Sequence, residues 1–171
     1  MKRIDVEELR RLYDSAQCSI RWEGLQTYLV PWEDEDFAAW RRGDPSPPSE
    51  RTDKYLTSLR ERTDSGRRVV RVRGLRRPVT EYTHYEFEHG YAPHATAGQE
   101  TVIVDLDEYP EFDGHDDFVV FDQDAVMWYR YDAECHLLGY DYSDEPEIVA
   151  DRTALLEQML AVAVPFTEVV L

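Results

Sequence analysis

Residues 118–142, FVVFDQDAVMWYRYDAECHLLGYDY, decide the fold of this chain. The stretch holds three runs rich in β-branched and aromatic residues, at 118–121, 126–131 and 136–142, and such residues favour extended strands. Short acidic segments separate the runs, Asp122-Gln123-Asp124 and Asp132-Ala133-Glu134, and residues of this kind are typical of tight turns. The pattern therefore predicts a meander of three strands.

Upstream of the meander, residues 67–73 alternate between two kinds of side chain. Val70 and Val72 fall on one face of an extended segment, and Arg71 and Arg73 fall on the other. Residues 101–105 form a shorter apolar run. We expect both segments to be strands, and we expect an extended segment over residues 18–30, with a turn at Glu23-Gly24.

Helical patterns surround these strands. Asp5 and Glu8 have the spacing of a capping box at the start of a first helix. Apolar periodicity and turn residues then place helices at residues 5–16, 33–42, 50–64, 78–91 and 146–164.

The order of these elements predicts an α/β (α+β) fold in a single domain over residues 1–171. We expect a central mixed sheet of about five strands with flanking helices in residues 50–171, the α/β core. A helical and extended N-terminal arm, residues 1–49, precedes it and ends in a linker rich in Pro and Ser at residues 43–49.

The net charge of −17 is unevenly distributed along the chain. Residues 1–77 carry 17 Lys and Arg against 14 Asp and Glu, whereas residues 78–171 carry 2 against 22. The acidic half argues against direct binding of nucleic acid, because phosphates would be repelled. A basic protein, a cation or a salt-rich cytoplasm fits it better, and a solvated face that only keeps the protein soluble is the alternative.

Several observations predict a cytoplasmic protein. No apolar run approaches the ~18 residues of a membrane span, and the N-terminus lacks the apolar stretch of a secretion signal. Cys18 and Cys135 lie far apart in the sequence and have no partners at metal-ligand spacing, so we expect two reduced thiols rather than a disulfide.

No complete catalytic motif is present, and we expect neither a cofactor nor a metal. The chain has no Gly-x-Ser-x-Gly elbow and no glycine-rich phosphate loop. His84, His89 and His94 recur every five residues, which does not place them on one helical face. The acidic clusters at residues 105–108 and 113–117 do not fit the calcium-loop pattern, so solvated loops are expected.

Six arginines between residues 67 and 77 suggest an anion-binding site, because guanidinium groups match phosphate and carboxylate geometry. Pairing of these arginines with acids of the same chain is the alternative. Candidate ligand-binding residues for a small phosphorylated or anionic molecule are Arg71, Arg73, Tyr82, Glu86, Asp122 and Tyr131.

A second set of candidates is expected to contact a protein partner. Tryptophans are frequent anchors of interfaces, and Trp32 and Trp40 lie beside the linker. Acids would face a basic partner, and the candidates are Asp113, Asp116 and Asp117. The alternative role of the tryptophans is to build the core.

Four blocks of sequence resemble one actinobacterial family. They are Arg71-Val72-Arg73 leading through Pro78 to residues 81–88, then residues 117–122, residues 131–139 and the closing Ala163-Val164-Pro165-Phe166. In this order they are similar to domain-of-unknown-function family six-eight-seven-nine, over residues 8–166. The resemblance implies a short cytosolic protein encoded beside a helix-turn-helix regulator, and it implies no particular activity.

The element order also resembles half of a phospholipase D-like domain. That chemistry needs a Lys two residues after a His, and neither Lys2 nor Lys54 has that position. The leading hypothesis is a non-enzymatic acidic module that partners or modulates a helix-turn-helix transcription regulator. The alternatives are a small-anion binding protein using the Arg/Tyr/Glu residues above, or an enzyme without a recognisable motif; the oligomeric state stays open.

Overall fold

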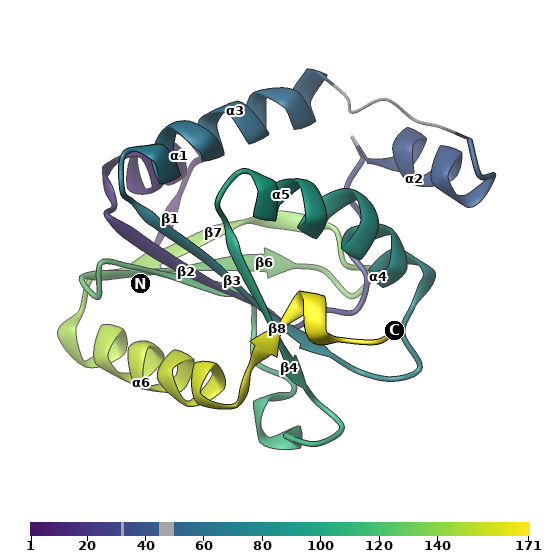
Figure 1. Cartoon of the computed structure of the whole chain (residues 1–171). Coiled ribbons are helices and arrows are strands. Elements are labelled where there is room, and N and C mark those ends of the chain that lie inside the picture. The colour runs from purple at the N-terminus through teal and green to yellow at the C-terminus, as the bar shows by residue number, and fades with distance from the viewer. Residues whose placement is uncertain (32, 45–49) are drawn as a thin grey trace.

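A computed structural model describes residues 1–31, 33–44 and 50–171 of the protein, and it is built around one eight-stranded sheet. The sheet has the order β1-β7-β6-β5-β2-β3-β4-β8 (Figure 1). The strands are β1 (Lys2–Ile4), β2 (Cys18–Glu23), β3 (Arg68–Leu75), β4 (Glu100–Asp105), β5 (Phe118–Phe121), β6 (Ala125–Tyr131), β7 (Leu137–Ser143) and β8 (Val164–Pro165).

The sheet is mixed, as expected. Strands β2, β3 and β4 run parallel to one another, and all other neighbours are antiparallel. The predicted meander is confirmed: β5, β6 and β7 are consecutive neighbours, with Phe118 opposite Trp128 and Val126 opposite Ser143. Its first turn places Asp122 and Gln123 at positive φ, a conformation that Asp and Asn adopt more readily than most residues.

Helices cover both faces of the sheet. The helical segments are α1 (Val6–Ser15), α2 (Asp34–Arg41), α3 (Glu50–Asp64), α4 (Glu81–Tyr85), the π-helix η1 (Glu86–Tyr91), α5 (Ala92–Thr96), the 3-10 turns η2 (Pro110–Phe112) and η3 (Phe166–Glu168), and α6 (Pro146–Val162). Figure 1 shows α6 on one face of the sheet, with α1, α3 and α5 on the other. No described helix has the length and apolar character needed to span a bilayer.

The main hydrophobic core lies between the sheet and α6. Trp22, Val72, Phe118 and Met159 are completely buried in it. Gly74 belongs to the strand beside Trp22, and a Cβ atom there would lie 2.7 Å from the indole ring. A side chain at position 74 would therefore collide with the buried indole ring.

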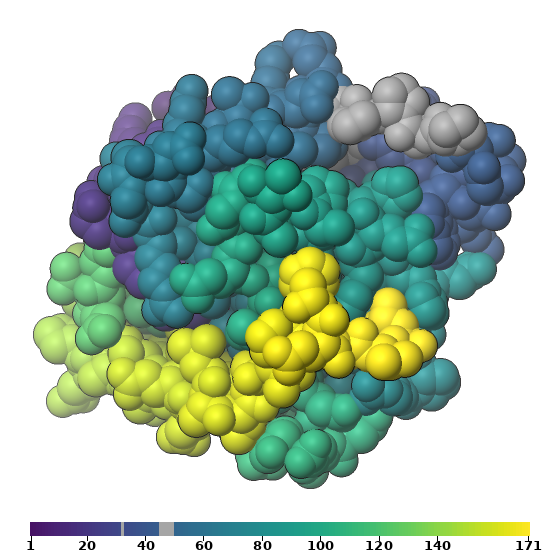
Figure 2. All heavy atoms as spheres, in the orientation of Figure 1, coloured from purple at the N-terminus to yellow at the C-terminus, as the bar shows by residue number. Residues whose placement is uncertain are grey.

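The opposite face has several smaller apolar clusters. One contains Leu75, Tyr91 and Ile103, against which Phe166 of η3 packs. Figure 2 shows the C-terminal segment lying against the α4–α5 region, in agreement with the edge contacts of Phe166 with Phe87 and Tyr91. These clusters leave room between them for polar side chains of the central strands.

Two expectations about the architecture need correction. The sheet has eight strands rather than about five, since β1 and β8 are only three and two residues long and carry no alternating pattern. The N-terminal segment also does not precede the sheet as an arm, because its strand β2 lies between β3 and β5. Within the segment 18–30 the strand ends at Glu23, and Leu29 forms only an isolated bridge with His136.

Candidate functional site: a buried charge cluster and an arginine pocket

The polar face of β2 and β3 carries charged residues into the interior. The alternation that puts Val70 and Val72 on the α6 face puts Arg71 and Arg73 on the other face, as the sequence predicts. In the parallel register Arg21 lies beside Arg71 and Glu23 beside Arg73. We call the six buried or largely buried groups on this side the charge cluster: Arg21, Glu23, Arg71, Arg73, Glu86 and Asp117.

Glu23 is the centre of this cluster. Its carboxylate lies 3.0 Å from the Arg21 guanidinium and 3.2 Å from that of Arg71. Burial opposes ionisation of Glu23, but Arg21, Arg71 and Arg73 outweigh that effect and hold its pKa below the usual value. Glu23 is therefore a buried counterion that allows two neighbouring arginines to lie side by side.

A second ion pair joins the strand to the π-helix. Arg73 is completely buried and its Nη2 atom donates to Glu86 at 3.0 Å. Arg73 also donates to the backbone carbonyl of Leu25. Burial raises the pKa of Glu86 to about 7, against the opposing effect of Arg73. π-Helical segments are frequent at functional sites, and this one positions Glu86 over the sheet.

Asp117 completes the cluster at the start of β5. It accepts hydrogen bonds from the Tyr28 hydroxyl at 2.7 Å and from the backbone of Gly24 at 2.8 Å. Its other neighbour is Arg21, at 3.7 Å. Burial raises the pKa of Asp117. The residue thus fixes the loop after β2 and is enclosed by its own chain.

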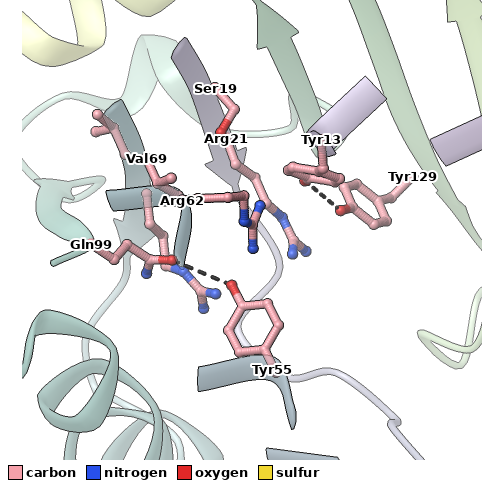
Figure 3. A pocket seen from close by; sticks show the side chains of 10 residues that line it. Tyr13, Ser19, Arg21, Tyr55, Arg62, Val69, Gln99 and Tyr129 are labelled. Carbon is pink, nitrogen blue, oxygen red and sulfur yellow. Dashed lines mark hydrogen bonds between the residues drawn. The ribbon is translucent and has the colours of Figure 1, made fainter. Parts of the chain in front are cut away.

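A cavity of about 120 Å³ opens beside Arg21 and Arg71, and we call it the arginine pocket. Figure 3 shows the side chains of Arg21 and Arg62 directed into one space, with Tyr55, Tyr13 and Tyr129 around it. Its lining consists of Tyr13, Ser19, Arg21, Tyr55, Arg62, Val69, Val70, Arg71, Gln99 and Tyr129. These residues come from α1, β2, α3, β3, β6 and the segment before β4.

Aromatic rings orient the guanidinium groups of the pocket. The guanidinium carbon of Arg21 lies 4.1 Å from the centre of the Tyr129 ring, and that of Arg62 lies 5.6 Å from the Tyr13 ring. The hydroxyls of Tyr13 and Tyr129 share a hydrogen bond of 3.0 Å, which leaves one hydroxyl hydrogen available. The arginines are thus held in position before any ligand is bound.

The pocket is lined by three guanidinium groups, and no carboxylate is among its described lining residues. The Nε–H groups of Arg21 and Arg71 are buried and have no hydrogen-bond partner within residues 1–31, 33–44 and 50–171. Arg62 has no carboxylate within 4.0 Å among those residues; its Nε donates to the carbonyl of Ser58. Buried donors normally find partners, so a group with several acceptor oxygens would satisfy this site.

The structure brings together five of the six ligand-binding candidates. Arg71 lines the pocket, and Arg73, two residues further along β3, pairs with Glu86. Tyr82 donates to Glu33 at 2.9 Å, and the ring of Tyr131 stacks on Tyr129. The sixth candidate, Asp122, lies apart, because it accepts from the backbone of Gln17 and Cys18 at the other end of β2.

Each described partner-binding candidate contacts its own chain. Asp113 pairs with Arg76, and Asp116 lies 2.5 Å from Arg130. Asp117 is 2% exposed and belongs to the charge cluster. Trp40 donates its indole N–H to Glu88 at 2.7 Å and stacks on Phe37. Trp32 lies outside the described residues.

Sequence reasoning missed Arg21, Tyr55, Arg62 and the other pocket residues. The alternation of residues 18–23 carries the same signal as that of residues 67–73, and it would have put Arg21 and Glu23 on the polar face. Tyr55 and Arg62 are seven residues apart on α3, a spacing of two turns. No sequence signal identified the sheet face that this helix covers.

Asp132, Glu134 and His136 form a separate exposed group in the turn between β6 and β7. One ligand atom of each lies within 4.8 Å of the others. Asp132 accepts hydrogen bonds from the backbone of Glu134 and His136 and contacts the His136 ring at 3.1 Å. These contacts close the turn, which accounts for the arrangement. Cys135 in this turn and Cys18 are both free thiols, as expected.

Comparison with known protein families finds a match that covers residues 7–170. The matching family is described as a domain of unknown function, DUF6879. A comparison with curated proteins found no match.

Proposed function

This chain belongs to the DUF6879 family, and we propose that it binds a small anionic molecule in the arginine pocket. The observation that carries the proposal is the convergence of Arg21, Arg62 and Arg71 on one cavity of about 120 Å³. Guanidinium groups are the side chains best suited to phosphate and carboxylate oxygens.

The charge distribution supports an anionic ligand in an acidic protein. The chain carries a net charge of −17, so three arginines around one cavity create a local potential opposite to that of the whole molecule. Low-dielectric walls strengthen such a local field. An anion that enters the pocket would gain from this field while the rest of the surface repels it.

The binding site is built from both strands and helices. Arg21 and Arg71 are fixed by Glu23, and ring contacts hold Arg21 and Arg62. Side chains that are already positioned lose little conformational entropy on binding. This arrangement supports a binding role. An enzyme without a recognisable motif is a less supported alternative.

Thermal unfolding in the presence of small anions tests the proposal. Phosphate, sulfate, malonate and citrate should be compared with sodium chloride at equal ionic strength, since general screening also affects so acidic a chain. At a ligand concentration of ~100 Kd, binding stabilises the folded state by about 2.7 kcal/mol. Arg71→Gln should abolish the effect, and Arg60→Gln, an exposed arginine on α3, should not. If no anion raises the midpoint above the chloride control, the proposal is wrong.

As a second candidate function, we propose that an acidic groove on α6 binds a basic protein. The groove measures about 450 Å³ and lies between α6 and the β5–β6 turn. Asp124, Asp144 and Glu157 line it together with Val149 and Ala150. Among the described residues, no cationic group lies within 4.0 Å of these three carboxylates. Carboxylates around a partly apolar floor suit a basic amphipathic segment.

The partner we propose is a helix-turn-helix transcription regulator, in the cytoplasm of an actinobacterium. By covering a DNA-contacting surface, the acidic groove would compete with DNA. Binding of the purified regulator encoded beside the gene should weaken steeply between about 0.05 and 0.5 M NaCl. The triple variant Asp124→Asn, Asp144→Asn, Glu157→Gln should lose binding, and Glu147→Gln on the same helix should not. Affinity that is independent of salt would contradict this candidate.

We also propose that the fold is related to half of a phospholipase D-like domain. The order of a strand, a helical crossover, antiparallel strands and a closing helix supports the relation. Superposition of β2–β7 on such a half-domain, with matching strand order and direction, is the test.

A further inference from the structure

We propose, building on the anion-binding function above, that the group bound in the arginine pocket is a phosphoryl group and that α3 provides the third side of its site. Arg21 and Arg71 would hold the group from the sheet, and Arg62 would hold it from the helix.

The number of guanidinium groups favours a tetrahedral oxyanion. A carboxylate has two oxygens in one plane, and one guanidinium fork can satisfy both. Here Arg21, Arg71 and Arg62 come from three different elements, β2, β3 and α3, and border the same cavity. A phosphoryl group has three terminal oxygens pointing in different directions, so each oxygen can face a different arginine.

The charges around the pocket leave a positive excess. Three arginines line the pocket, Arg21, Arg62 and Arg71. Arg21 and Arg71 share the buried carboxylate of Glu23, and Asp117 lies 3.7 Å from Arg21. Arg62 has no described carboxylate within 4.0 Å, so its charge is not matched by an ion pair. Arg21 and Arg71 are also direct cross-strand neighbours, a placement that is unfavourable for like charges. A phosphate monoester carries about −1.5 to −2 at pH 7 and would relieve both effects.

Uncharged hydroxyl groups around the pocket could also donate hydrogen bonds to phosphoryl oxygens. The shared hydrogen bond of Tyr13 and Tyr129 leaves one hydroxyl hydrogen free, and Ser19 borders the same space. The Tyr55 hydroxyl lies 3.4 Å from Gln99, a long hydrogen bond that a stronger acceptor could replace. Tyr55 is 38% exposed, which places the open side of the pocket at α3. The organic part of a phosphate ester would leave the pocket on this side.

Because α3 contributes Tyr55 and Arg62, binding should hold this helix against the sheet. Within the part of the chain that the structure describes, the buried apolar side chains of α3 are Leu56 and Leu59, which pack on Val69 and Ala97. A ligand gripped from both sides would add a polar connection to this small cluster. Local opening of α3 should therefore become rarer when the pocket is filled.

Isothermal titration with inorganic phosphate, sulfate and malonate at constant ionic strength tests the inference. Malonate is a dianion whose charge lies on two planar carboxylates. Comparing it with phosphate therefore separates the effect of ligand geometry from the effect of ligand charge. We expect phosphate to bind, sulfate to bind comparably, and malonate to bind about tenfold more weakly. Arg62→Gln should weaken phosphate binding about tenfold or more, and Arg62→Lys should not restore it, because an ammonium lacks the fork. Arg60→Gln on the same helix is the matched control.

Hydrogen exchange of the wild-type protein provides a second measurement that needs no variant. Phosphate should slow amide exchange in residues 50–64 more than in α6. Equal affinities for malonate and phosphate, together with an unchanged Arg62→Gln, would overturn the phosphoryl assignment and leave anion binding intact. Phosphate binding without protection of α3 would overturn the role of the helix. If no anion binds at all, the function on which the inference rests fails with it.

Discussion

At the residue scale, the most unusual feature is the completely buried Arg73 and its partner Glu86. Burying a charge costs several kcal/mol unless it is paired and hydrogen-bonded. The Glu86 carboxylate, the Leu25 carbonyl and the Tyr28 hydroxyl provide these partners. Each buried charge is therefore stable only when its partner is present.

Removing one member of this pair should be strongly destabilising. Arg73→Met leaves Glu86 buried without its cation, and we expect the free energy of unfolding to fall by about 3–5 kcal/mol. Urea denaturation measures the change. The double variant Arg73→Met, Glu86→Leu is the control, since it removes both charges and should recover part of the loss. A loss below about 1 kcal/mol in the single variant would show that the pair does not matter for stability.

Glu86 should also make stability depend on pH. Its pKa in the folded protein is about 7, raised by burial above the ordinary value near 4.5. Between pH values of about 4.5 and 7, Glu86 is protonated in the folded protein and ionised in the unfolded protein. The free energy of unfolding should therefore decrease as pH rises from about 5 to 7 and stay level above that. One pKa unit corresponds to about 1.4 kcal/mol.

The measurement compares wild type with Glu86→Gln by urea denaturation from pH 5 to 8. The charged groups near Glu86 are Arg73, Arg71, Glu23 and Glu33, and they are present in both proteins. The difference in the free energy of unfolding between the two proteins therefore reports on Glu86 alone. From pH 8 down to pH 5, wild type should gain about 1–3 kcal/mol of stability relative to Glu86→Gln. Parallel curves would mean that Glu86 is ionised throughout this range.

At the element scale, local sequence signals identified helices better than short strands. The helix over residues 50–64 and the capping box at α1 are confirmed. The helix expected to end at residue 91 continues through α5 to Thr96, with Pro93 in the first turn of α5. The π-helical turn has no sequence signature that we recognised.

The capping box of α1 makes a quantitative prediction. The Asp5 side chain accepts hydrogen bonds from the backbone of Glu7 at 2.9 Å and of Glu8 at 2.8 Å. Asp5→Ala leaves these amides without a partner, and we expect a loss of about 0.5–2 kcal/mol in urea denaturation. Asp14→Ala, an exposed residue at the other end of the same helix, should change stability by less than about 0.5 kcal/mol. Equal effects of the two substitutions would rule out a specific cap.

At the scale of the whole molecule, the net charge of −17 means that the acidic side chains should repel one another. Salt screens repulsion between exposed charges, whereas the buried charge cluster is screened far less. We expect the thermal midpoint to rise by a few degrees, roughly 3–6 °C, between 0.05 and 0.5 M NaCl. Choline chloride should act similarly if screening is the cause, and a response limited to sodium would instead indicate a specific cation site. A falling midpoint would contradict the expectation.

The sequence by itself determined the α/β class, the meander of residues 118–142 and the faces of residues 67–73. Alternation and turn residues are local properties, and each stretch carries its own pattern. Only the tertiary structure decided that β2 lies at the centre of the sheet, that Arg21 is the neighbour of Arg71, and that α3 carries Arg62 over the same cavity. These features depend on how separate elements pack on one another, and such packing leaves no periodic signal in any one of them.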